Sequence, residues 1–334
     1  MSYGIGMKIG VLGAGTWGMA LARMLANTNN EVMVWSAIDK EIDEFSKTRM
    51  HPNLPGMIIP DSIVFTKNIE EVCKNKEILL MAVPSVFVRS TAKLMSEFVS
   101  DGQVVVDVAK GIESDTLLTM SQIIEEEIEK DIKVVALSGP THAEEVAKDL
   151  PTTIVSACED IKTSEFVKDI FSNSNMRVYT STDVVGVELC GAIKNVIALA
   201  AGISAGMGYG DNAKAALITR GMIEMMKLGV AMNCKMDTFY GLAGVGDLIV
   251  TATSIHSRNN KAGNLIGKGY SKNKAIEEVG MVVEGVNAIP AAIKLSEKYN
   301  VEMPIVNAVN EIVNNNKDPK IVVKELMERN IVIK

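Results

Sequence analysis

The stretch Lys8–Ala26, KIGVLGAGTWGMALARMLA, decides the fold of this chain. It begins with an apolar run typical of a buried strand and ends with a run that has a helical pattern. Between the two, the glycines Gly13, Gly15 and Gly18 fit the pattern GxGxxG. In that pattern the first glycine permits a tight turn, the second lets the backbone approach a pyrophosphate, and the third lets the helix pack closely on its strand. The stretch therefore predicts a strand, a dinucleotide-binding turn and a helix.

Short apolar runs alternate with amphipathic segments through the rest of the first half. Enough chain separates these runs for crossover helices or loops, which is typical of a parallel sheet with helices on both faces. The expected strands are Glu31–Trp35, Glu77–Val83, Gln103–Val108, Lys133–Ser138 and Thr152–Ala157. The fold class predicted for this half is therefore α/β, a doubly wound parallel sheet of the Rossmann type.

From about Val184 the β-type runs disappear, and long helical patterns dominate. The expected helices are Val184–Ala205, Asn212–Met232, Ser271–Val279, Asn287–Lys298 and Pro304–Val313. The change of pattern predicts two domains, a Rossmann domain over 1–183 and an all-helical C-terminal domain over 184–334. The boundary depends on this change alone, because no repeat or low-complexity linker marks it.

Composition and charge argue against several classes of partner. A net charge of −7 and an isoelectric point near 5.2 argue against nucleic acid and against an acidic membrane surface, since either needs a dense basic face. The N-terminus does not have the pattern of a signal peptide, and the weakly polar run Val196–Gly208 is shorter than a membrane span of about 20 residues. We therefore expect a cytoplasmic protein without membrane insertion.

Cysteine and histidine spacing gives no sign of a metal site or a disulfide framework. The four cysteines form no CxxC pair, and the three histidines do not have metal-ligand spacing. The residues concerned are Cys73, Cys158, Cys190, Cys234, His51, His142 and His256. We expect no metal.

The residues after the second expected strand bear on the choice between NAD and NADP. A carboxylate at that position would bind the adenosine ribose hydroxyls of NAD. Ser36 stands there instead, Asp39 comes three residues later, and Lys40 is the nearest cation for a 2′-phosphate. The preference is left open between the two cofactors, with a slight lean toward tolerance of NADP.

Lys110 follows the expected strand Gln103–Val108 and precedes a glycine. In a doubly wound sheet, ligands bind beyond the carboxyl ends of the strands. A lysine at this edge indicates contact with a phosphate, although an ordinary surface lysine is the alternative. The next strand, Lys133–Ser138, leads at the same edge into the polar and glycine-containing stretch 139–143.

Lys194 is the one cation in Glu188–Gly202, a helical stretch that is almost free of charge and rich in small residues that let other backbone approach. Burying an unpaired lysine is costly, so the side chain must reach water or face a polar cavity with a partner. Burial favours the neutral amine, whereas pairing with Asp247 favours the ammonium ion, and the sequence leaves the balance open. Lys194 is a candidate for proton transfer, with a snorkelling lysine as the alternative.

The stretch Gly241–Asn259, GLAGVGDLIVTATSIHSRN, has the composition of a site for an anionic substrate. It places an acid at Asp247 and then, past two glycine breaks, the pair Arg258 and Asn259. Glycine permits close backbone approach, and arginine offers a planar fork of donors that fits a phosphate or carboxylate. The segment alone does not identify the reaction.

Seven segments spread over nearly the whole chain carry a family resemblance. They are GAGTWG at 13–18, VAKGIES at 108–114, SGPTHAEEV at 138–146, ELCGAIKNVIALAAGI at 188–203, GDNAKAALITRG at 210–221, the stretch 241–259 and VVEG at 282–285. In this order and spacing they resemble the bacterial NAD(P)-dependent glycerol-3-phosphate dehydrogenases. That family combines an N-terminal Rossmann domain with an all-helical domain, in agreement with the patterns above.

The resemblance implies roles for individual residues. The lysine that matches Lys194 is the general acid/base of the family. Substrate contacts are implied for Lys110, Gly139, Thr141, Asp247, Ser257, Arg258 and Asn259. Cofactor contacts are implied for Thr16, Trp17, Lys110, Ala143, Arg258, Val282 and Glu284, beside the three glycines of the turn and Ser36. Many members carry Arg or His just after the second-strand Trp, where this chain has Ser36-Ala37, and this departure weakens an assignment to NADPH.

The implied reaction is hydride transfer between C4 of the nicotinamide and C2 of dihydroxyacetone phosphate, giving sn-glycerol 3-phosphate, the glycerophospholipid precursor. Lys194 would polarise the carbonyl and donate the proton, oriented by Asp247 together with Asn195 and Thr251. Arg258 and Asn259 would anchor the substrate phosphate.

Two alternatives and the assembly state remain open. One alternative is a related Rossmann hydroxyacid dehydrogenase that acts on a carboxylate substrate. The other is a sensor that binds NAD(P)H without turnover, although the acidic balance argues against a DNA-binding sensor. A homodimer is what the family resemblance suggests.

Overall fold

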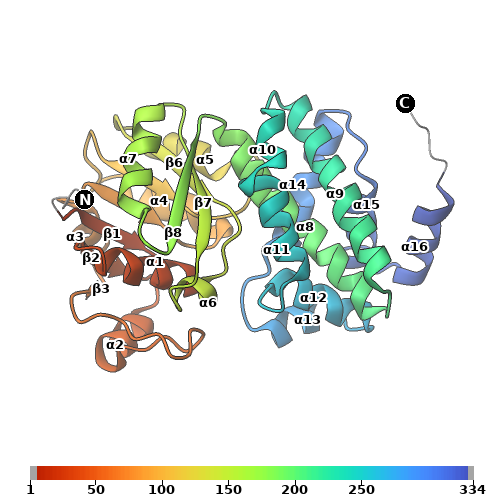
Figure 1. The fold of residues 1–334 in the computed structure, drawn as a ribbon, viewed down its shortest axis with the longest axis horizontal. Coiled ribbons are helices and arrows are strands. Elements are labelled where there is room, and N and C mark those ends of the chain that lie inside the picture. Colours follow the sequence, from red (N-terminus) through yellow and green to blue (C-terminus); the bar gives the residue numbers. More distant parts are fainter. Residues whose placement is uncertain (1–5, 330–334) are drawn as a thin grey trace. The chain divides into compact units, whose positions relative to one another are not determined.

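The computed structural model describes residues 6–329, which form two compact units. The first unit consists of the residues up to Lys110 together with Leu118–Glu188, and the second consists of Gly111–Leu117 together with the residues from Leu189. Figure 1 shows the chain coloured from red at the N-terminus to blue at the C-terminus. The main chain thus passes to the second unit after residue 188, whereas the sequence pattern placed the boundary at 183.

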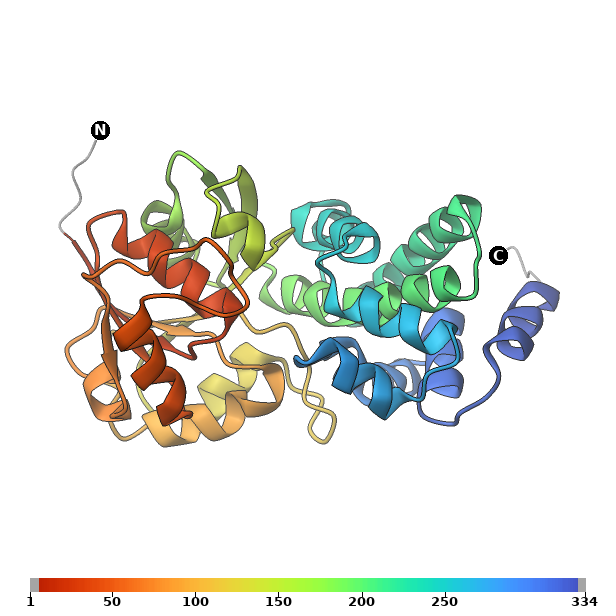
Figure 2. The same cartoon turned by 90° about the horizontal axis from the view of Figure 1, so that it is seen from below.

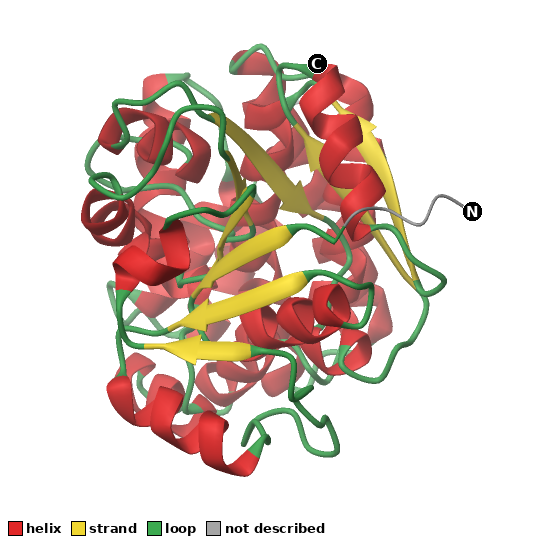
Figure 3. Cartoon of the chain, turned by 90° about the vertical axis from the view of Figure 1, so that its left-hand side faces the viewer, coloured by secondary structure: helices red, strands yellow, loops and turns green. Residues whose placement is uncertain are grey.

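The first unit is built on one eight-stranded sheet, seen in Figure 3 as yellow arrows lying side by side with red helices around them. Its strands are β1 (Lys8–Leu12), β2 (Glu31–Trp35), β3 (Val64–Thr66), β4 (Ile78–Met81), β5 (Val104–Asp107), β6 (Lys133–Ser138), β7 (Thr152–Ala157) and β8 (Met176–Ser181). Their order is β3-β2-β1-β4-β5-β6-β7-β8, whose first six strands have the order of a dinucleotide-binding sheet. The predicted fold class is confirmed.

The sheet is mostly parallel, and β7 is where the direction changes. It pairs antiparallel with β6, and β8 then runs parallel to β7. Between β6 and β7 lies the helix α6 (Ala143–Val146), whose four residues rise only about 6 Å, too little to carry the chain back along a strand. The chain therefore turns back at the carboxyl edge of the sheet, which keeps the stretch 139–143 beside the ends of the parallel strands.

Helices cover both faces of the sheet, so its central strands are apolar on both sides. The helices of this unit are α1 (Thr16–Ala26), α2 (Asp39–Thr48), α3 (Ile69–Cys73), α4 (Val88–Met95), α5 (Met120–Glu127), α6 and α7 (Ile161–Phe171), with a short 3₁₀ turn η1 (Ser85–Phe87) before α4. On one face Ile9 and Val11 pack with residues of α1, α6 and α7. On the other, Leu12 packs with residues of α3, α4 and α5.

The described part of the second unit contains helices and no strand, as Figure 2 shows in green to blue. Its elements are α8 (Val184–Gly206), which begins in the first unit, α9 (Asp211–Ala231), α10 (Met236–Tyr240), the π-helical turn η2 (Leu242–Gly246), α11 (Asp247–Thr253), α12 (Arg258–Gly267), α13 (Lys272–Val279), α14 (Glu284–Lys298), α15 (Pro304–Val313) and α16 (Pro319–Glu328). Among the helices within residues 6–329, α8 alone has the length and mean hydropathy of a membrane span, but 89% of its apolar 18-residue stretch is buried. That burial is typical of a core helix.

Several elements were not among those predicted from the sequence. The strand β3 has only three residues, and the edge strand β8 alternates buried and exposed residues at Met176–Tyr179 in a segment without a marked apolar run. In the second unit α10 and α11 have only five and seven residues, and α12 and α16, each as long as the predicted α15 with ten residues, were also not predicted. Short elements take their stability from packing rather than from their own pattern, so pattern alone finds them poorly.

Glu224 on α9 is a buried acid that fixes the start of α15. Its carboxylate accepts hydrogen bonds from the backbone N–H groups of Ile305 (2.8 Å) and Val306 (3.3 Å), which lie in the first turn, where helices lack internal partners for their N–H groups. Burial raises the pKa of Glu224 to about 7, although the two N–H groups, and then Arg220 and Arg329, act to lower it. The helical unit thus contains an acid whose charge is disfavoured by its surroundings.

We expect Glu224 to make the folded protein less stable as the pH rises from about 4.5 to about 7. In that window the unfolded chain releases the proton while the folded chain keeps it, which corresponds to about 3 kcal/mol once both have ionised. The Glu224→Gln variant cannot ionise and still accepts one N–H bond. The free energy of unfolding of this variant minus that of the original protein should increase by about 2 to 3 kcal/mol from about pH 5 to about pH 8.

Urea unfolding at the two pH values checks this expectation. Glu297→Gln, a change of an exposed acid on α14, serves as the control and should show a difference from the original protein that does not change with pH. If Glu224→Gln behaved like this control, the assignment of a raised pKa to Glu224 would be wrong.

Candidate active site

The turn after β1 has the geometry of a dinucleotide-binding turn. Gly13 has a φ of +117°, and its backbone N–H donates to the carbonyl oxygen of Trp35 at 2.8 Å. A Cβ at Gly13 would lie 2.7 Å from the carbonyl oxygen of Ala82, and one at Gly18 would lie 2.3 Å from the carbonyl oxygen of Gly13. Both positions therefore require glycine, the first for the turn and the second for the approach of α1.

Gly15 is exposed. Unlike Gly13 and Gly18, it has open space beside it, because a Cβ at Gly15 would have no heavy atom within 4 Å. It is the residue before α1, whose first turn has no side-chain cap and no acidic residue. The N–H groups at a helix start favour an anion, and here open space lies beside them. These residues fit a dinucleotide pyrophosphate.

Lys110 lies at the carboxyl edge of the sheet with two of the other predicted site residues. Its Nζ donates to the carbonyl oxygen of Gly139 (3.0 Å) and lies 3.4 Å from Oγ1 of Thr141, which itself donates to Gly139 (3.0 Å). Gly139 has a φ of +154° and a Cβ there would press against the backbone of Ile154. The structure thus brings together Lys110, Gly139 and Thr141, and Ala143 starts the short helix that follows.

Two carboxylates of the first unit, Asp107 and Glu188, are buried. Asp107 ends β5, and its Oδ2 is a buried atom for which the described residues provide no hydrogen-bond partner. Glu188 accepts hydrogen bonds from the backbone N–H and the side chain of Ser121. Burial and then the charge of Glu188 raise the pKa of Asp107 well above its usual value, and burial raises the pKa of Glu188. This pair was not predicted from the sequence, where Asp107 lies inside the expected strand Gln103–Val108.

Lys194 lies on α8 in the second unit and is paired. Its Nζ donates to Oδ1 of Asp247 (2.7 Å) and to Oγ1 of Thr251 (2.6 Å), one helical turn further along α11. Lys194 is 4% exposed and Asp247 is fully buried. The geometry replaces the snorkelling alternative with a buried ion pair that holds the amine in a fixed position.

A π-helical turn directs Asp247 toward this lysine. The turn η2 runs straight into α11, and Gly244 within it packs so closely that a Cβ would lie 2.1 Å from the carbonyl oxygen of Phe239. A π turn adds a residue to the helix and rotates the side chains that follow it, and such turns are frequent at functional sites. The glycines that the sequence shows as two breaks thus belong to one continuous helical segment around Asp247.

The helix α12 begins with the predicted anion-binding residues. Ser257 caps it, since its side chain accepts from the backbone N–H of Asn260, and Arg258 is the first helical residue and half-buried. The side chain of Asn259 is buried and makes two bonds, donating to Oδ1 of Asn195 (2.9 Å) and accepting from the backbone N–H of Gly285 (2.8 Å). Asn259 therefore links α8, α12 and α14.

Glycines allow α8 and α12 to pack with their backbones in contact. A Cβ at Gly202 or Gly206 of α8 would lie 2.2 Å from a carbonyl oxygen of α12, and a Cβ at Gly263 or Gly267 of α12 would lie 2.2 Å from a carbonyl oxygen of α8. Both helices thus carry glycines four residues apart on their facing sides. This packing fixes the start of α12, with Arg258, relative to the helix that bears Lys194.

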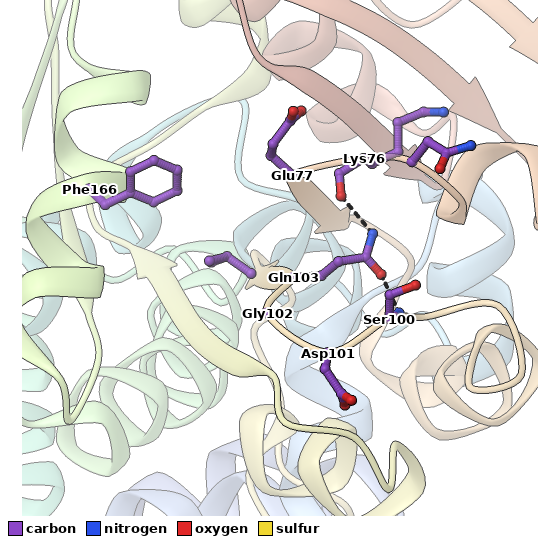
Figure 4. Close-up of a pocket in the computed structure, with 9 residues that line it drawn as sticks. Lys76, Glu77, Ser100, Asp101, Gly102, Gln103 and Phe166 are labelled. Carbon is purple, nitrogen blue, oxygen red and sulfur yellow. Dashed lines mark hydrogen bonds between the residues drawn. The ribbon is translucent and has the colours of Figure 1, made fainter.

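The pocket drawn in Figure 4 lies at the opposite edge of the sheet from the dinucleotide-binding turn. It is lined by residues that precede β4 and β5, among them Glu77 and Gln103, and by Phe166 of α7. The Gln103 amide donates to the carbonyl oxygen of Lys76 (2.7 Å) and accepts from the backbone N–H of Ser100 (2.6 Å). Its polar groups are used in holding these loops, and we assign it no part in the chemistry.

Comparison with known proteins identifies the family. Sequence models described as the N-terminus and the C-terminus of NAD-dependent glycerol-3-phosphate dehydrogenase match residues 8–164 and 183–324. The chain belongs to this family.

Relatives in this family resemble the chain over almost its whole length. It is 64% identical to glycerol-3-phosphate dehydrogenase (NAD(P)+) 2 of Lactobacillus delbrueckii subsp. bulgaricus, with 96% of this chain and 97% of that protein covered. It is 53% identical to glycerol-3-phosphate dehydrogenase (NAD(P)+) of Agathobacter rectalis, with 96% of each covered. The crystal structure of the glycerol-3-phosphate dehydrogenase of Coxiella burnetii matches with a TM-score of 0.93 at 33% identity, covering 97% of this chain and 99% of that one.

The structure groups the predicted site residues within each unit, while their roles stay predictions. In the first unit the glycine turn, Thr16 and Trp17 belong to one constellation and Lys110, Gly139, Thr141 and Ala143 to another. In the second, Lys194, Asp247 and Thr251 form one group, and Asn195, Asn259 and Gly285 form another that joins α12 to the start of α14, where Val282 and Glu284 lie. Among residues 6–329, no three His, Cys, Asp or Glu side chains form a group that could hold a metal.

Two further residues near the dinucleotide turn are His51, considered from the sequence only as a metal ligand, and Glu41, which was not considered. His51 is buried and stacks on Phe45 (ring centroids 5.1 Å apart). Burial lowers its pKa, against smaller effects from the carbonyl of Ala14 and from Glu41 and Glu44. Glu41 accepts a hydrogen bond from the side chain of Ser36 (2.7 Å). Neither follows the end of a strand directly, which is the signal that the sequence analysis used.

Proposed function

We propose that this chain transfers hydride between NAD(P)H and C2 of dihydroxyacetone phosphate, forming sn-glycerol 3-phosphate, with Lys194 as the proton donor. Activity as an NAD(P)-dependent glycerol-3-phosphate dehydrogenase, an oxidoreductase of lipid metabolism, follows from the family. The roles of single residues rest on the geometry. The observation that carries them is the buried group of Lys194, Asp247 and Thr251.

When bound, the nicotinamide cofactor supplies the hydride that reduces C2. The residues of the chain stabilise the negative charge that develops on the oxygen at C2 and transfer the proton. Lys194 donates a proton to the oxygen on C2 as the carbonyl becomes an alcohol, and accepts it in the reverse direction. Asp247 and Thr251 hold Nζ in place, so that no reorganisation is needed during the reaction.

The start of α12 is the proposed phosphate site. Arg258 carries a fork of donors, the first turn of α12 contains no acidic residue, and the backbone N–H groups of that turn favour an anion. The side chain of Asn259 makes two bonds inside the protein, so its contribution is to fix this turn and to offer its backbone N–H. A carboxylate-specific hydroxyacid dehydrogenase would not need a dianion site of this kind.

We expect Arg258→Ala to raise the KM for dihydroxyacetone phosphate by about 10²-fold and to change kcat much less, because the arginine binds a part of the substrate that does not react. Lys261→Ala, an exposed change on the same helix, should leave both constants unaltered. An unchanged KM in Arg258→Ala would show that α12 does not provide the phosphate site.

Initial rates of NADH and NADPH oxidation with dihydroxyacetone phosphate, compared with those for several 2-oxo and 3-oxo acids, test the function itself. Turnover of the oxo acids in place of dihydroxyacetone phosphate would overturn the proposed substrate.

Assembly as a homodimer and a cytoplasmic location stay proposals. The family resemblance supports the first, and the composition of the chain, with four free buried cysteines, supports the second. We infer a small phosphorylated substrate as the partner of the site, and neither nucleic acid nor membrane lipid.

A further inference from the structure

We propose that Glu41 makes this chain prefer NADH to NADPH, with Ser36 holding the Glu41 carboxylate where the adenosine ribose binds. The inference rests on the proposed dinucleotide-dependent function only in requiring that a nicotinamide cofactor binds. It concerns a choice that the names of the relatives leave open, since they specify NAD(P).

The end of β2 is where a Rossmann sheet distinguishes the two cofactors. An acidic group there binds the ribose hydroxyls of NAD, and a cation there accepts the 2′-phosphate of NADP. In this chain β2 ends at Trp35, whose carbonyl oxygen accepts from the N–H of Gly13 in the dinucleotide-binding turn (2.8 Å). The residue that follows, Ser36, is therefore next to the turn, and it is 6% exposed.

The side chain of Ser36 connects this position to α2. Its hydroxyl accepts from the backbone N–H of Ile38 (3.1 Å) and donates to Oε2 of Glu41 (2.7 Å). The helix begins at Asp39, so Glu41 lies in its first turn and its side chain reaches back to the end of the strand. A carboxylate thus stands at the end of β2, although the residue that carries it comes five positions after Ser36.

His51 provides a second indication that Glu41 lies on the side of the glycine turn. It interacts with the backbone carbonyl of Ala14, which lies between Gly13 and Gly15, and the charges of Glu41 and Glu44 act on it electrostatically. The Glu41 carboxylate therefore lies near both the end of β2 and the turn that fits the pyrophosphate. A ribose joined to that pyrophosphate would meet its free oxygen, Oε1, which can accept from a ribose hydroxyl.

The charges around this position disfavour a 2′-phosphate. The helix α2 carries four acids, Asp39, Glu41, Asp43 and Glu44, against two lysines, Lys40 and Lys47. Lys67, which follows β3, is paired with Asp43 (2.7 Å), and Arg49 donates to the carbonyl oxygens of Pro60 and Ile63. Lys40 is exposed, and the described residues give no bond that would hold it at the end of β2. A phosphate dianion here would face the carboxylate of Glu41, and like charges that face each other disfavour binding.

Fluorescence titration of the full-length protein with NADH and with NADPH, without substrate, tests the proposal. We expect NADH to bind at least about 10-fold more tightly than NADPH. Glu41→Gln keeps the size of the side chain and its bond to Ser36 but removes the charge, and it should reduce this ratio by about 10-fold, mainly by tightening NADPH binding. Ser36→Ala should reduce the ratio to a smaller extent, because the carboxylate stays but is no longer held.

Glu165→Gln is the control, since it makes the same change at an exposed acid of the first unit, on α7 and outside the acidic helix α2. It should alter the ratio by less than about 2-fold. Equal affinity for both cofactors in the original protein, or a ratio that Glu41→Gln leaves unchanged, would overturn the proposal. Because the titration needs no turnover, a protein that discriminates between the cofactors but does not reduce dihydroxyacetone phosphate would contradict the proposed function alone.

Discussion

Replacing Lys194 with alanine is expected to lower kcat by about 10³-fold or more, while the Kd for NADH stays within about 2-fold of its original value. The lysine is the proposed donor of the proton to the substrate oxygen, and its positive charge stabilises that oxygen as negative charge develops. The dinucleotide-binding turn belongs to the first unit and Lys194 to the second. Single-turnover kinetics and fluorescence titration with NADH measure the two quantities separately.

The alanine substitution also destabilises the protein. A second variant distinguishes this loss of stability from the loss of the proton donor. Without Lys194 the fully buried carboxylate of Asp247 loses its ion pair, at a cost of about 3 to 5 kcal/mol. Combining Lys194→Met with Asp247→Asn removes both charges and keeps similar shapes, so its free energy of unfolding should lie closer to that of the original protein. If this double variant regained turnover together with stability, Lys194 would be a structural residue only.

Lys194→Arg separates the charge from the proton. Arginine keeps the positive charge but does not release a proton in proteins, so it can stabilise negative charge and cannot act as the acid. We expect this variant to remain at least about 10²-fold slower than the original protein. Turnover near the original rate would assign Lys194 an electrostatic role without proton transfer.

The sequence predicts well those parts of the site whose residues are neighbours along the chain. The glycine turn is an example, because the strand, the three glycines and the helix are consecutive and each has its own pattern. The grouping of Lys110 with Gly139 and Thr141 follows from a rule of topology, since each of these residues lies beyond the carboxyl end of a strand. Both predictions needed no knowledge of side-chain packing.

Contacts between distant segments were harder to predict. A lysine in an apolar helix must have a partner, and Asp247, 53 residues away, was considered as that partner from the residues alone. Thr251, the second acceptor of Lys194, was considered only with the family resemblance. Glu41 was missed for a different reason, because the chain turns into α2 after Ser36 and brings the carboxylate back to the end of the strand. The distance along the sequence was therefore a poor guide to the distance in space.

The contact between α8 and α12 shows the same limit. The richness of α8 in small residues indicated that other backbone approaches it, and this is confirmed at Gly202. The partner was not identified, because α12 was not among the helices predicted from the sequence. Glycines four residues apart on both helices become informative once the two helices are known to face each other.

The second large effect is expected at this contact, from Gly263→Ala. A Cβ at this position would lie 2.2 Å from the carbonyl oxygen of Leu199 in the backbone of α8, and a helix backbone cannot yield except by moving as a whole. We expect α12 to shift by about 1 Å, which displaces Arg258 and lowers kcat/KM for dihydroxyacetone phosphate by about 10²-fold. The Kd for NADH, measured by fluorescence, should change little.

Two comparisons show whether the loss comes from the position of α12 or from general destabilisation. Overpacking of this kind costs about 1 to 3 kcal/mol, and urea unfolding measures it. Gly267→Ala introduces the same 2.2 Å contact one turn further from Arg258, against Ile203, so it should cost similar stability but less activity. Equal losses of activity in the two variants would argue for destabilisation alone. A smaller loss in Gly267→Ala at equal stability would mean that the glycines position the phosphate-binding turn relative to Lys194, and that the backbone contact of α8 with α12 is part of what makes the site work.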